Sequence, residues 1–352
     1  MIRGLGLAAS AALLPSSSRA ENLVRVGFGT TWATFSHLEL ARSEGLLGDI
    51  SVQITVLEDT IRGYQMLAAG QLDVMFGTLD FAPIAASQKL PLRLVSAVDI
   101  SFGADQIVLA PNLKAPDLKG AKVGATEGFV GEIFLTEYLY RNGLTAKDVT
   151  WVNISPDQVA GPMLSGDLKA AYVYDPWTSQ LETALPGTQR VLTSDDSALL
   201  ASGILEDALY MSQDFLAKRP DAADRFLKGY FDGVKLRGTK PDYGNQKLAD
   251  FTKWPLADVE HLVGKDGKAN KGGMYVIDFD ESARQCGVLE GDGPLGQKNG
   301  ALKGAIAALE ESWIRRGTLA SKTDSLADIL DCSPQKRLLA AGYRSSVAYV
   351  PK

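Results

Sequence analysis

The sequence predicts an α/β protein of two units, with the second unit inserted into the first. Two observations predict this arrangement. Strand-like alternation takes turns with helix-like spacing from Leu23 to Ala110, and the same alternation resumes beyond a Pro-, Lys- and Asp-rich segment at Pro111–Gly120. Strands that alternate with helices favour sheets with parallel strands and covered faces. We therefore assign residues 21–110 and 210–352 to the first unit and residues 111–209 to the second.

Each element of the first unit has its own signal. Apolar and polar residues alternate along Val24–Phe28, which predicts a strand, and a predicted helix from about Thr34 to Glu44 ends at Gly45. The same reasoning predicts a strand at Ile50–Val56, a helix at Arg62–Ala69, and strands at Leu72–Phe76, Leu92–Val98 and Gln106–Ala110.

The second unit repeats the alternation. We expect a strand ending at Lys122–Gly124, a helix at Val130–Arg141, a strand at Val149–Ile154, a helix at Asp157–Leu164, a strand at Ala170–Tyr174 and a helix that begins at Pro176.

The remainder of the chain returns to the first unit and is mainly helical. Asp207–Met211 is the predicted return segment, and helices follow at Asp221–Leu236 and Ala301–Arg316. Gly264–Gly300 is rich in Gly and Asp, so it predicts a long loop with one short strand at Met274–Ile277. Two crossings between the units would form a hinge, and we expect a ligand cleft between them at the carboxyl ends of parallel strands.

The composition excludes several classes of protein. The chain has 352 residues, of which 45% are apolar, so it is long enough for two globular domains of about 100–200 residues each. No apolar run reaches the roughly 18 residues of a spanning helix, and a net charge of -6 without a Lys/Arg block disfavours nucleic acid. Gly27-Phe28-Gly29 lacks a third glycine at dinucleotide spacing, and His37 and His261 lack partners at metal-ligand spacing. We therefore expect no cofactor and no metal.

The first 20 residues have the pattern of an export signal. Arg3 precedes an apolar, Ala-rich stretch from Leu5 to Leu14, and Ser18-Arg19-Ala20 offers small residues before a cleavage point. A frayed N-terminal helix is the alternative. Export to the periplasm or out of the cell would allow Cys286 and Cys332 to form a disulfide, although the sequence does not show whether they lie close enough.

Several short motifs resemble those of the periplasmic binding proteins of ABC importers for nitrate, sulfonates and taurine, a family related to the group that binds the pyrimidine precursor of thiamine. The motifs are Met66–Val74, Asp117–Gly124, Glu127–Val130, Tyr174–Trp177 and Leu326–Leu330. The resemblance implies the type II periplasmic binding protein fold, with a hinge and a central cleft. It also implies a monomeric receptor, without catalytic residues, that passes its solute to a membrane permease and its ATPase.

The resemblance further implies where the solute binds. Members of the family bind it with loops that follow the strands of both lobes, which in this chain are residues 29–35, 77–81, 126–130 and 174–177. With one residue added from the hinge side of the first lobe, the candidate ligand-binding residues are Thr31, Trp32, Thr78, Asp80, Phe81, Asp105, Glu127, Gly128, Phe129, Asp175 and Trp177.

The carboxylates among these candidates allow two interpretations. Glu127 either offsets the dipole of the helix that begins near Val130 or pairs with a cation of the ligand, while Asp80 and Asp175 either cap helices or contact the ligand. Several carboxylates in one cleft need a positive partner, which a ligand with an ammonium or amidinium group would supply. We therefore expect a small zwitterionic or cationic solute, such as taurine or a related amine.

Three other functions stay open. An alkanesulfonate or another organic anion would be held by the helix start near Gly128 and by Thr30, Thr31 and Thr78. An enzyme like those that make the thiamine pyrimidine would share the fold, but the predicted export and the lack of His or Lys in the cleft loops disfavour it. A sensor subunit that feeds a membrane kinase has the same sequence features as an import receptor.

Overall fold

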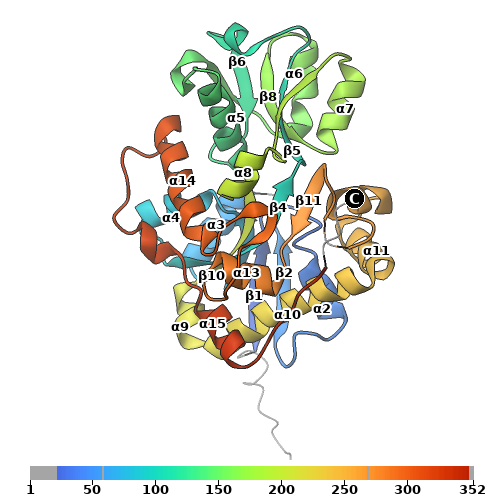
Figure 1. Cartoon of the computed structure of the whole chain (residues 1–352), viewed down its shortest axis with the longest axis vertical. Coiled ribbons are helices and arrows are strands. Elements are labelled where there is room, and N and C mark those ends of the chain that lie inside the picture. The colour runs from blue at the N-terminus through green and yellow to red at the C-terminus, as the bar shows by residue number, and fades with distance from the viewer. Residues whose placement is uncertain (1–21, 58, 268, 349–352) are drawn as a thin grey trace, which may run out of the picture.

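The chain folds into two lobes, each built on its own sheet (Figure 1). The computed structural model describes residues 22–348 apart from residues 58 and 268, so the expected export signal at residues 1–20 lies outside the described residues. The first lobe has a six-stranded sheet in the order β11 (Gly273–Val276), β4 (Leu92–Phe102), β10 (Glu206–Ser212), β3 (Val74–Thr78), β1 (Leu23–Phe28) and β2 (Ser51–Val56). The second lobe has a five-stranded sheet in the order β7 (Thr150–Asn153), β6 (Lys122–Ala125), β8 (Ala170–Tyr174), β5 (Asp105–Leu109) and β9 (Gln189–Thr193).

Both sheets mix parallel and antiparallel strands. In the first lobe β1 runs parallel to β2 and β3, whereas β10 lies antiparallel between β3 and β4. In the second lobe β6 is parallel to β7 and β8, and β5 is antiparallel to β8 and β9. The end of β3 and the start of β10 therefore lie at the same edge of the first sheet, where Thr78 pairs with Asp207.

Helices cover the sheets of both lobes. Those of the first lobe are α2 (His37–Ser43), α3 (Thr60–Ala68), α4 (Phe81–Ser87), α9 (Gln213–Lys218), α10 (Pro220–Thr239), α11 (Pro241–Thr252), α12 (Leu256–Val263), α13 (Phe279–Gln285), α14 (Ala301–Arg316) and α15 (Ser333–Ala340). The inserted segment adds α5 (Val130–Arg141), α6 (Ala160–Leu164), α7 (Trp177–Ala184) and α8 (Ser197–Ser202). Five short 3₁₀ helices lie between these elements, namely η1 (Ala115–Leu118), η2 (Ala146–Asp148), η3 (Pro156–Gln158), η4 (Pro294–Gly296) and η5 (Leu326–Ile329).

The chain crosses between the lobes earlier than the sequence predicts. The predicted crossing follows residue 110, but β5 already belongs to the second sheet, so the crossing lies at Gly103-Ala104. The return crossing comes after β9, and β10, which begins at Glu206, belongs to the first sheet. Gly103 is required there because its φ is +110° and an added Cβ would meet Gly272 Cα at 2.8 Å.

Ser194 fastens the two crossing segments to each other. Its hydroxyl lies 2.8 Å from the Gly103 nitrogen and 2.6 Å from the Ser101 hydroxyl, and its own N–H donates to the Asp105 carbonyl at 3.0 Å. The hinge is therefore a hydrogen-bonded seam rather than two independent linkers.

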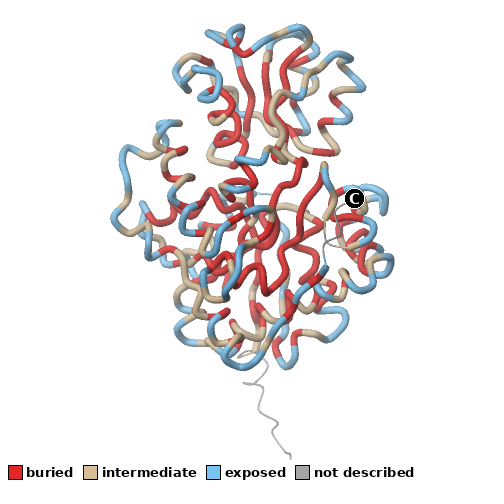
Figure 2. Tube along the Cα trace, in the orientation of Figure 1, coloured by how far each residue is buried: buried red, intermediate tan, exposed pale blue. Residues whose placement is uncertain are grey.

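The buried strands form the centre of each lobe, as the red segments of Figure 2 show. All five residues of β3 are buried, and successive side chains point to opposite faces of the sheet. Val74 and Phe76 pack with Phe226 of α10 on one face, whereas Met75 packs with Leu67 of α3 on the other. Burial on both faces is why this strand has an almost uninterrupted apolar sequence.

The segment predicted as a loop at Gly264–Gly300 contains a helix as well as the expected strand. Helix α13 begins at Phe279 and is capped reciprocally: Asp278 accepts the N–H of Glu281 at 3.0 Å, and Glu281 accepts the N–H of Asp278 at 3.1 Å. The prediction of a long loop with one short strand was incomplete, because it rested on the Gly and Asp content of the segment and overlooked this capping signal.

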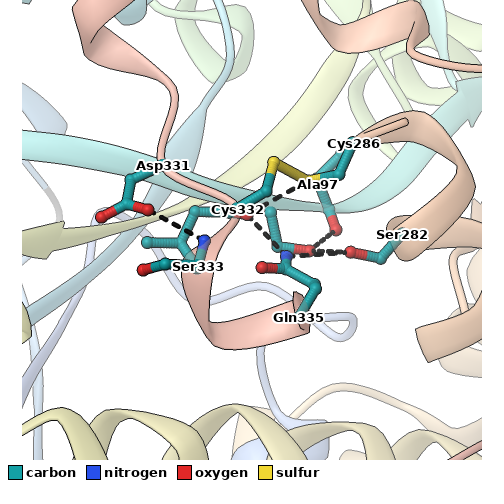
Figure 3. Close-up of a disulfide and its surroundings, with 9 residues drawn as sticks. Ala97, Ser282, Cys286, Asp331, Cys332, Ser333 and Gln335 are labelled. Atoms are coloured by element: carbon teal, nitrogen blue, oxygen red, sulfur yellow. Dashed lines mark hydrogen bonds between the residues drawn. A yellow bond between two sulfur atoms is a disulfide. The ribbon is translucent and has the colours of Figure 1, made fainter. Parts of the chain in front are cut away.

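A disulfide joins Cys286, just after α13, to Cys332, just before α15 (Figure 3). The two Cα atoms are 6.0 Å apart, within the range that a disulfide spans. Gln335 strengthens the same junction, because its amide donates to the Val95 carbonyl at 2.7 Å and to the Ser282 hydroxyl at 3.4 Å. The C-terminal helices are thus tied to the first sheet through β4.

Candidate functional site

A small inner cavity of about 60 Å³ lies between the lobes. It opens where β1 and β3 end and where β10 begins, and the second lobe closes it with β5, β8 and the start of α5. The polar side chains in its wall are Thr30, Thr60, Thr78, Ser101, Asp105, Tyr172, Tyr174, Glu206 and Asp207. The apolar ones are Trp32, Phe35, Phe129, Val130, Leu205 and Met274.

An outer cavity of about 800 Å³ adjoins the inner one and shares Thr30, Trp32 and Tyr174 with it. Its remaining wall comes from the loop after β1, from η3, from α7 and the loop before it, and from α11, α12 and the residues between them. The residues are Thr31, Asp157, Asp175, Pro176, Trp177, Ser179, Thr252, Trp254, Asp258, His261 and Leu262. Small-molecule sites commonly measure about 300–1,000 Å³, so the outer cavity alone has room for a solute.

The acidic groups of the inner cavity are held by hydrogen bonds within the protein. The Tyr172 hydroxyl donates to Asp105, and the side-chain amides of Gln285 and Gln297 donate to Glu206. Asp207 lies opposite Asp99, a fully buried residue on the neighbouring strand β4. These carboxyl groups are fixed at the cavity before any solute enters.

Burial raises the pKa values of these carboxyl groups, because the protein interior disfavours the charged form. The pKa of Glu206 rises to about 8, and that of Asp105 rises above its ordinary value. Burial also raises the pKa values of Asp99 and Asp207, and their mutual repulsion adds to the effect for Asp207. The inner cavity is therefore a place where negative charge lacks compensation.

Basic side chains are scarce in both walls. Among the described residues, neither lining contains Lys or Arg, and His261 in the outer cavity is 52% exposed. His261 lies across the cleft from Asp175, with 3.6 Å between Nε2 and Oδ2. The inner cavity offers an anionic solute no charged partner.

Aromatic rings separate the two cavities. Trp32 makes edge-to-face contacts with Tyr174 of the second lobe, at 5.9 Å between ring centroids, and with Trp254 of the first lobe, at 5.8 Å. Such rings can hold a flat group or a cation against their faces. A solute that reaches the inner cavity from the outer one must pass Trp32 and Tyr174.

The start of α5 carries its own negative charge. Glu132 accepts the N–H of Gly128 at 2.9 Å and pairs with Arg316 of the first lobe at 2.6 Å. The side chain of Glu132 is nearly buried, so it already complements the positive end of the helix dipole. Glu127 is exposed, and its N–H donates to Asn153 at 3.0 Å.

The structure brings together seven of the eleven candidate ligand-binding residues, namely Thr31, Trp32, Thr78, Asp105, Phe129, Asp175 and Trp177, in the walls of the two cavities. The other four line neither cavity. Asp80 and Phe81 are buried, with the Phe81 ring stacked on Tyr64 at 3.6 Å, while Glu127 and Gly128 lie at the start of α5 away from both walls.

Both capping predictions can be compared with the structure. Asp175 accepts hydrogen bonds from the hydroxyl and the N–H of Ser179 on α7, at 2.8 and 3.3 Å, so it combines a capping role with a place in the outer wall. Asp80 precedes α4 but makes no side-chain hydrogen bond to the helix.

The sequence reasoning missed Asp207, Glu206 and Ser101 of the inner wall and Trp254, Asp258 and His261 of the outer one. Asp207 was assigned to a return segment, and no spacing pattern marks it as a site residue. Its position at the start of an antiparallel strand was the signal, since that end meets the carboxyl ends of the parallel strands.

The described residues contain neither a cluster of metal ligands nor a membrane-spanning helix. Within the described residues, no group of three or more His, Cys, Asp or Glu side chains is arranged to hold a metal ion. In the same part of the chain, every helix is too short or too polar to cross a membrane.

The two-lobed fold with a cleft between the lobes is the fold of periplasmic substrate-binding proteins. The alkanesulfonate-binding protein SsuA from Xanthomonas axonopodis pv. citri, bound to MOPS, superimposes with a TM-score of 0.64 at 16% identity over 88% of this chain and 98% of its own. The nitrate-binding protein NrtA from Synechocystis PCC 6803 gives 0.67 at 15% identity over 91% of this chain and 89% of its own. The desulfurization enzyme DszB has the same fold, with a TM-score of 0.60 at 13% identity over 92% of this chain and 100% of its own.

The chain belongs to the NMT1-like family, whose model matches residues 24–243. A protein of Brucella abortus (strain 2308), named as a binding protein, is 26% identical over 275 residues, which are 76% of this chain and 84% of the relative. The resemblance and the fold class that the sequence predicts are confirmed by these comparisons.

Proposed function

We propose that this protein is a solute-binding receptor of an ABC importer and that it captures a small organic cation or zwitterion, such as taurine or a related amine, between its lobes. It acts as a monomer outside the cytoplasmic membrane and delivers the solute, without converting it, to a membrane permease and its ATPase. One observation carries the choice of solute: Asp105 and Asp207 line the inner cavity, and no Lys, Arg or His of the described residues lines it with them.

The sizes of the two cavities support a solute with two parts. The inner cavity accommodates a compact charged group, and the outer cavity accommodates the remainder. An ammonium group in the inner cavity faces Asp105 and Asp207 and passes the ring faces of Trp32 and Tyr174 on its way. The acidic end of a zwitterion would then point outward, toward His261.

An organic anion is the second candidate, and the ligands named for SsuA and NrtA favour it. In this chain a sulfonate in the inner cavity would face two carboxyl groups, and Glu132 already occupies the start of α5. Its remaining partners there are the hydroxyl groups of the wall, those of Thr30, Thr60, Thr78, Ser101, Tyr172 and Tyr174. We rank the cation first because a positive charge in the inner cavity offsets the carboxyl groups there, whereas an anion would be repelled by them.

A thermal-shift screen with propylamine, taurine, 1-propanol and propanesulfonate tests the proposal. A ligand at about 100 times its dissociation constant adds about 2.7 kcal/mol of stability, which raises the melting temperature by several degrees. We expect shifts with the amine or with taurine and none with the alcohol or the sulfonate. A shift with the sulfonate alone would contradict the cationic assignment.

The carboxylates can be tested in the same assay. Asp105→Asn removes one charge-assisted contact worth about 1.5–3 kcal/mol, so affinity should fall at least about tenfold. Asp167→Asn is the matched control, because Asp167 is 59% exposed in the second lobe and lines neither cavity. Equal affinities of both variants would remove Asp105 from the site.

A further inference from the structure

Two carboxyl groups face each other at the back of the inner cavity. Asp207 on β10 lies directly opposite Asp99 on β4 in the sheet register, so the two side chains point to the same face of the sheet. Asp207 lines the cavity, while Asp99 lies behind it and is fully buried. A solute can therefore touch Asp207 but reaches Asp99 only through it.

The surroundings of Asp99 favour a proton between the two carboxyl groups. Its Oδ2 accepts from the Thr34 hydroxyl, whereas no N–H or O–H of another described residue reaches its buried Oδ1. Two ionised carboxylates cannot hydrogen-bond to each other, because each only accepts. One proton shared by the pair satisfies both groups, and the pair then carries a single negative charge.

The groups that surround the Asp99–Asp207 pair disfavour a second negative charge on the pair. The acidic groups whose negative charge repels that of the pair are Asp80 after β3, Asp105 on β5 and Glu206 on β10. The phenols around it are Tyr64 on α3, Tyr172 on β8, Tyr210 on β10 and Tyr230 on α10.

Two basic side chains lie near these neighbours, on α2 and α10. The His37 ring packs on Tyr230 at 6.2 Å, and burial lowers the pKa of His37 to about 3, so it is neutral. Arg237 acts on Tyr230 and donates to Asn245 and to the Val263 carbonyl. Within the described residues, neither His37 nor Arg237 hydrogen-bonds to Asp99 or Asp207.

We propose, building on the function proposed above, that the Asp99–Asp207 pair is the subsite for the cationic group of the solute and that the shared proton leaves as that group enters. The exchange balances: the receptor with its shared proton and a protonated amine give the complex and one proton, which passes to the solvent. The incoming positive charge lies against Asp207 and compensates the charge of the pair in place of the proton. Asp105, fixed by Tyr172, adds a further carboxyl group to the wall of the same cavity.

This exchange couples affinity to pH with a defined sign. The empty receptor holds the proton and the complex does not, so a rise in pH favours binding. Affinity should increase about tenfold per pH unit while the empty pair keeps its proton, and it should level off once the pair is ionised.

Calorimetric titration with propylammonium chloride at about pH 6 counts the protons released when it is run in phosphate and in cacodylate, two buffers of different ionisation enthalpy without an ammonium group. We expect about one proton per bound propylammonium. Asp99→Asn should still bind propylammonium but should release no proton, because an amide then supplies a fixed N–H to Asp207. Asp167→Asn should release as many protons as the unmodified chain.

The outcomes separate this inference from the proposed function. Binding of propylammonium without proton release would overturn the exchange and leave the cationic receptor intact. Binding of propanesulfonate but not of propylammonium would overturn both. If Asp99→Asn does not fold, infrared spectroscopy of the unmodified chain decides: the carbonyl band of protonated carboxyl groups should lose intensity when propylammonium is added, and an unchanged band would refute the exchange.

Discussion

Replacing Arg316 by glutamine is expected to weaken solute binding by about a hundredfold. Arg316, at the end of α14 in the first lobe, donates two hydrogen bonds to Glu132 on α5 in the second lobe, at 3.1 and 2.6 Å, and its guanidinium lies 4.2 Å from the centre of the Trp151 ring. Since Arg316 belongs to the first lobe and both of its partners belong to the second, this bridge stabilises the arrangement of the lobes seen here and is lost when the lobes separate.

The magnitude follows from the two bonds and their burial. Glu132 is 3% exposed, so water cannot replace the lost guanidinium efficiently. A hydrogen bond to a charged group contributes about 1.5–3 kcal/mol, and we take a total of about 3 kcal/mol for the closed form. Each 1.4 kcal/mol or so changes an equilibrium tenfold, which gives the hundredfold weakening.

Titration calorimetry with the solute found in the screen measures this effect. Arg344→Gln is the matched control, because Arg344 makes a similar two-bond pair with Asp280 inside the first lobe, at 3.0 Å for each bond. The control should bind like the unmodified chain. An affinity of Arg316→Gln within about twofold of the unmodified chain would refute the reasoning, since the bridge would then be equally strong in the open and closed forms.

Three further predictions concern stability and the limits of the site. Cys332→Ser should lower the free energy of unfolding by up to about 4 kcal/mol, because the disulfide to Cys286 spans a sequence separation of 46; a denaturant midpoint that reductant does not change would contradict this. Burial raises the pKa of Asp80 from 3.8 to about 7, so the folded state keeps a proton that the unfolded chain loses in that window. Stability should therefore fall as pH rises from about 4 to about 7, and the fall should be smaller in Asp80→Asn, as urea unfolding at both ends of the range would show. Glu127→Gln should bind the solute within about twofold of the unmodified chain, since Glu127 lies outside both cavities; a tenfold loss by calorimetry would place it in the site.

The sequence predicts the parts of the site that follow parallel strands. Thr78 is the last residue of β3, and Asp175 comes directly after β8. Both line the cleft because the carboxyl ends of such strands meet at the sheet edge that faces it. Asp105 is a different case, since it begins β5 at the crossing between the lobes.

Antiparallel strands are the reason for the omissions. Asp207 lies near the start of β10, directly after Glu206. Strand β10 runs between β3 and β4 in the opposite direction to β3, so the amino end of β10 reaches the cleft. Met274 on β11 enters the inner wall in the same way, because β11 is antiparallel to β4. Local periodicity does not reveal the direction of a strand within its sheet, which depends on long-range pairing.

The position of the hinge depends on long-range contacts as well. The Pro-rich segment at Pro111–Gly120 has the composition of a linker, yet it lies in the second lobe and includes η1. The true crossing at Gly103 is marked by its φ of +110° and its contact with Gly272, both of which arise only in the folded chain. By contrast, the Asp278–Glu281 capping box of α13 was readable in the sequence.

The most direct test of the account is a calorimetric titration of the purified chain with propylammonium and, separately, with propanesulfonate, which share a three-carbon chain and differ in the sign of their charge. We predict that propylammonium binds and that Asp207→Asn lowers its affinity at least about tenfold, whereas propanesulfonate gives no heat of binding. Binding of propanesulfonate alone, unaffected by Asp207→Asn, would contradict the central claim that the carboxylates of the inner cavity select a cation.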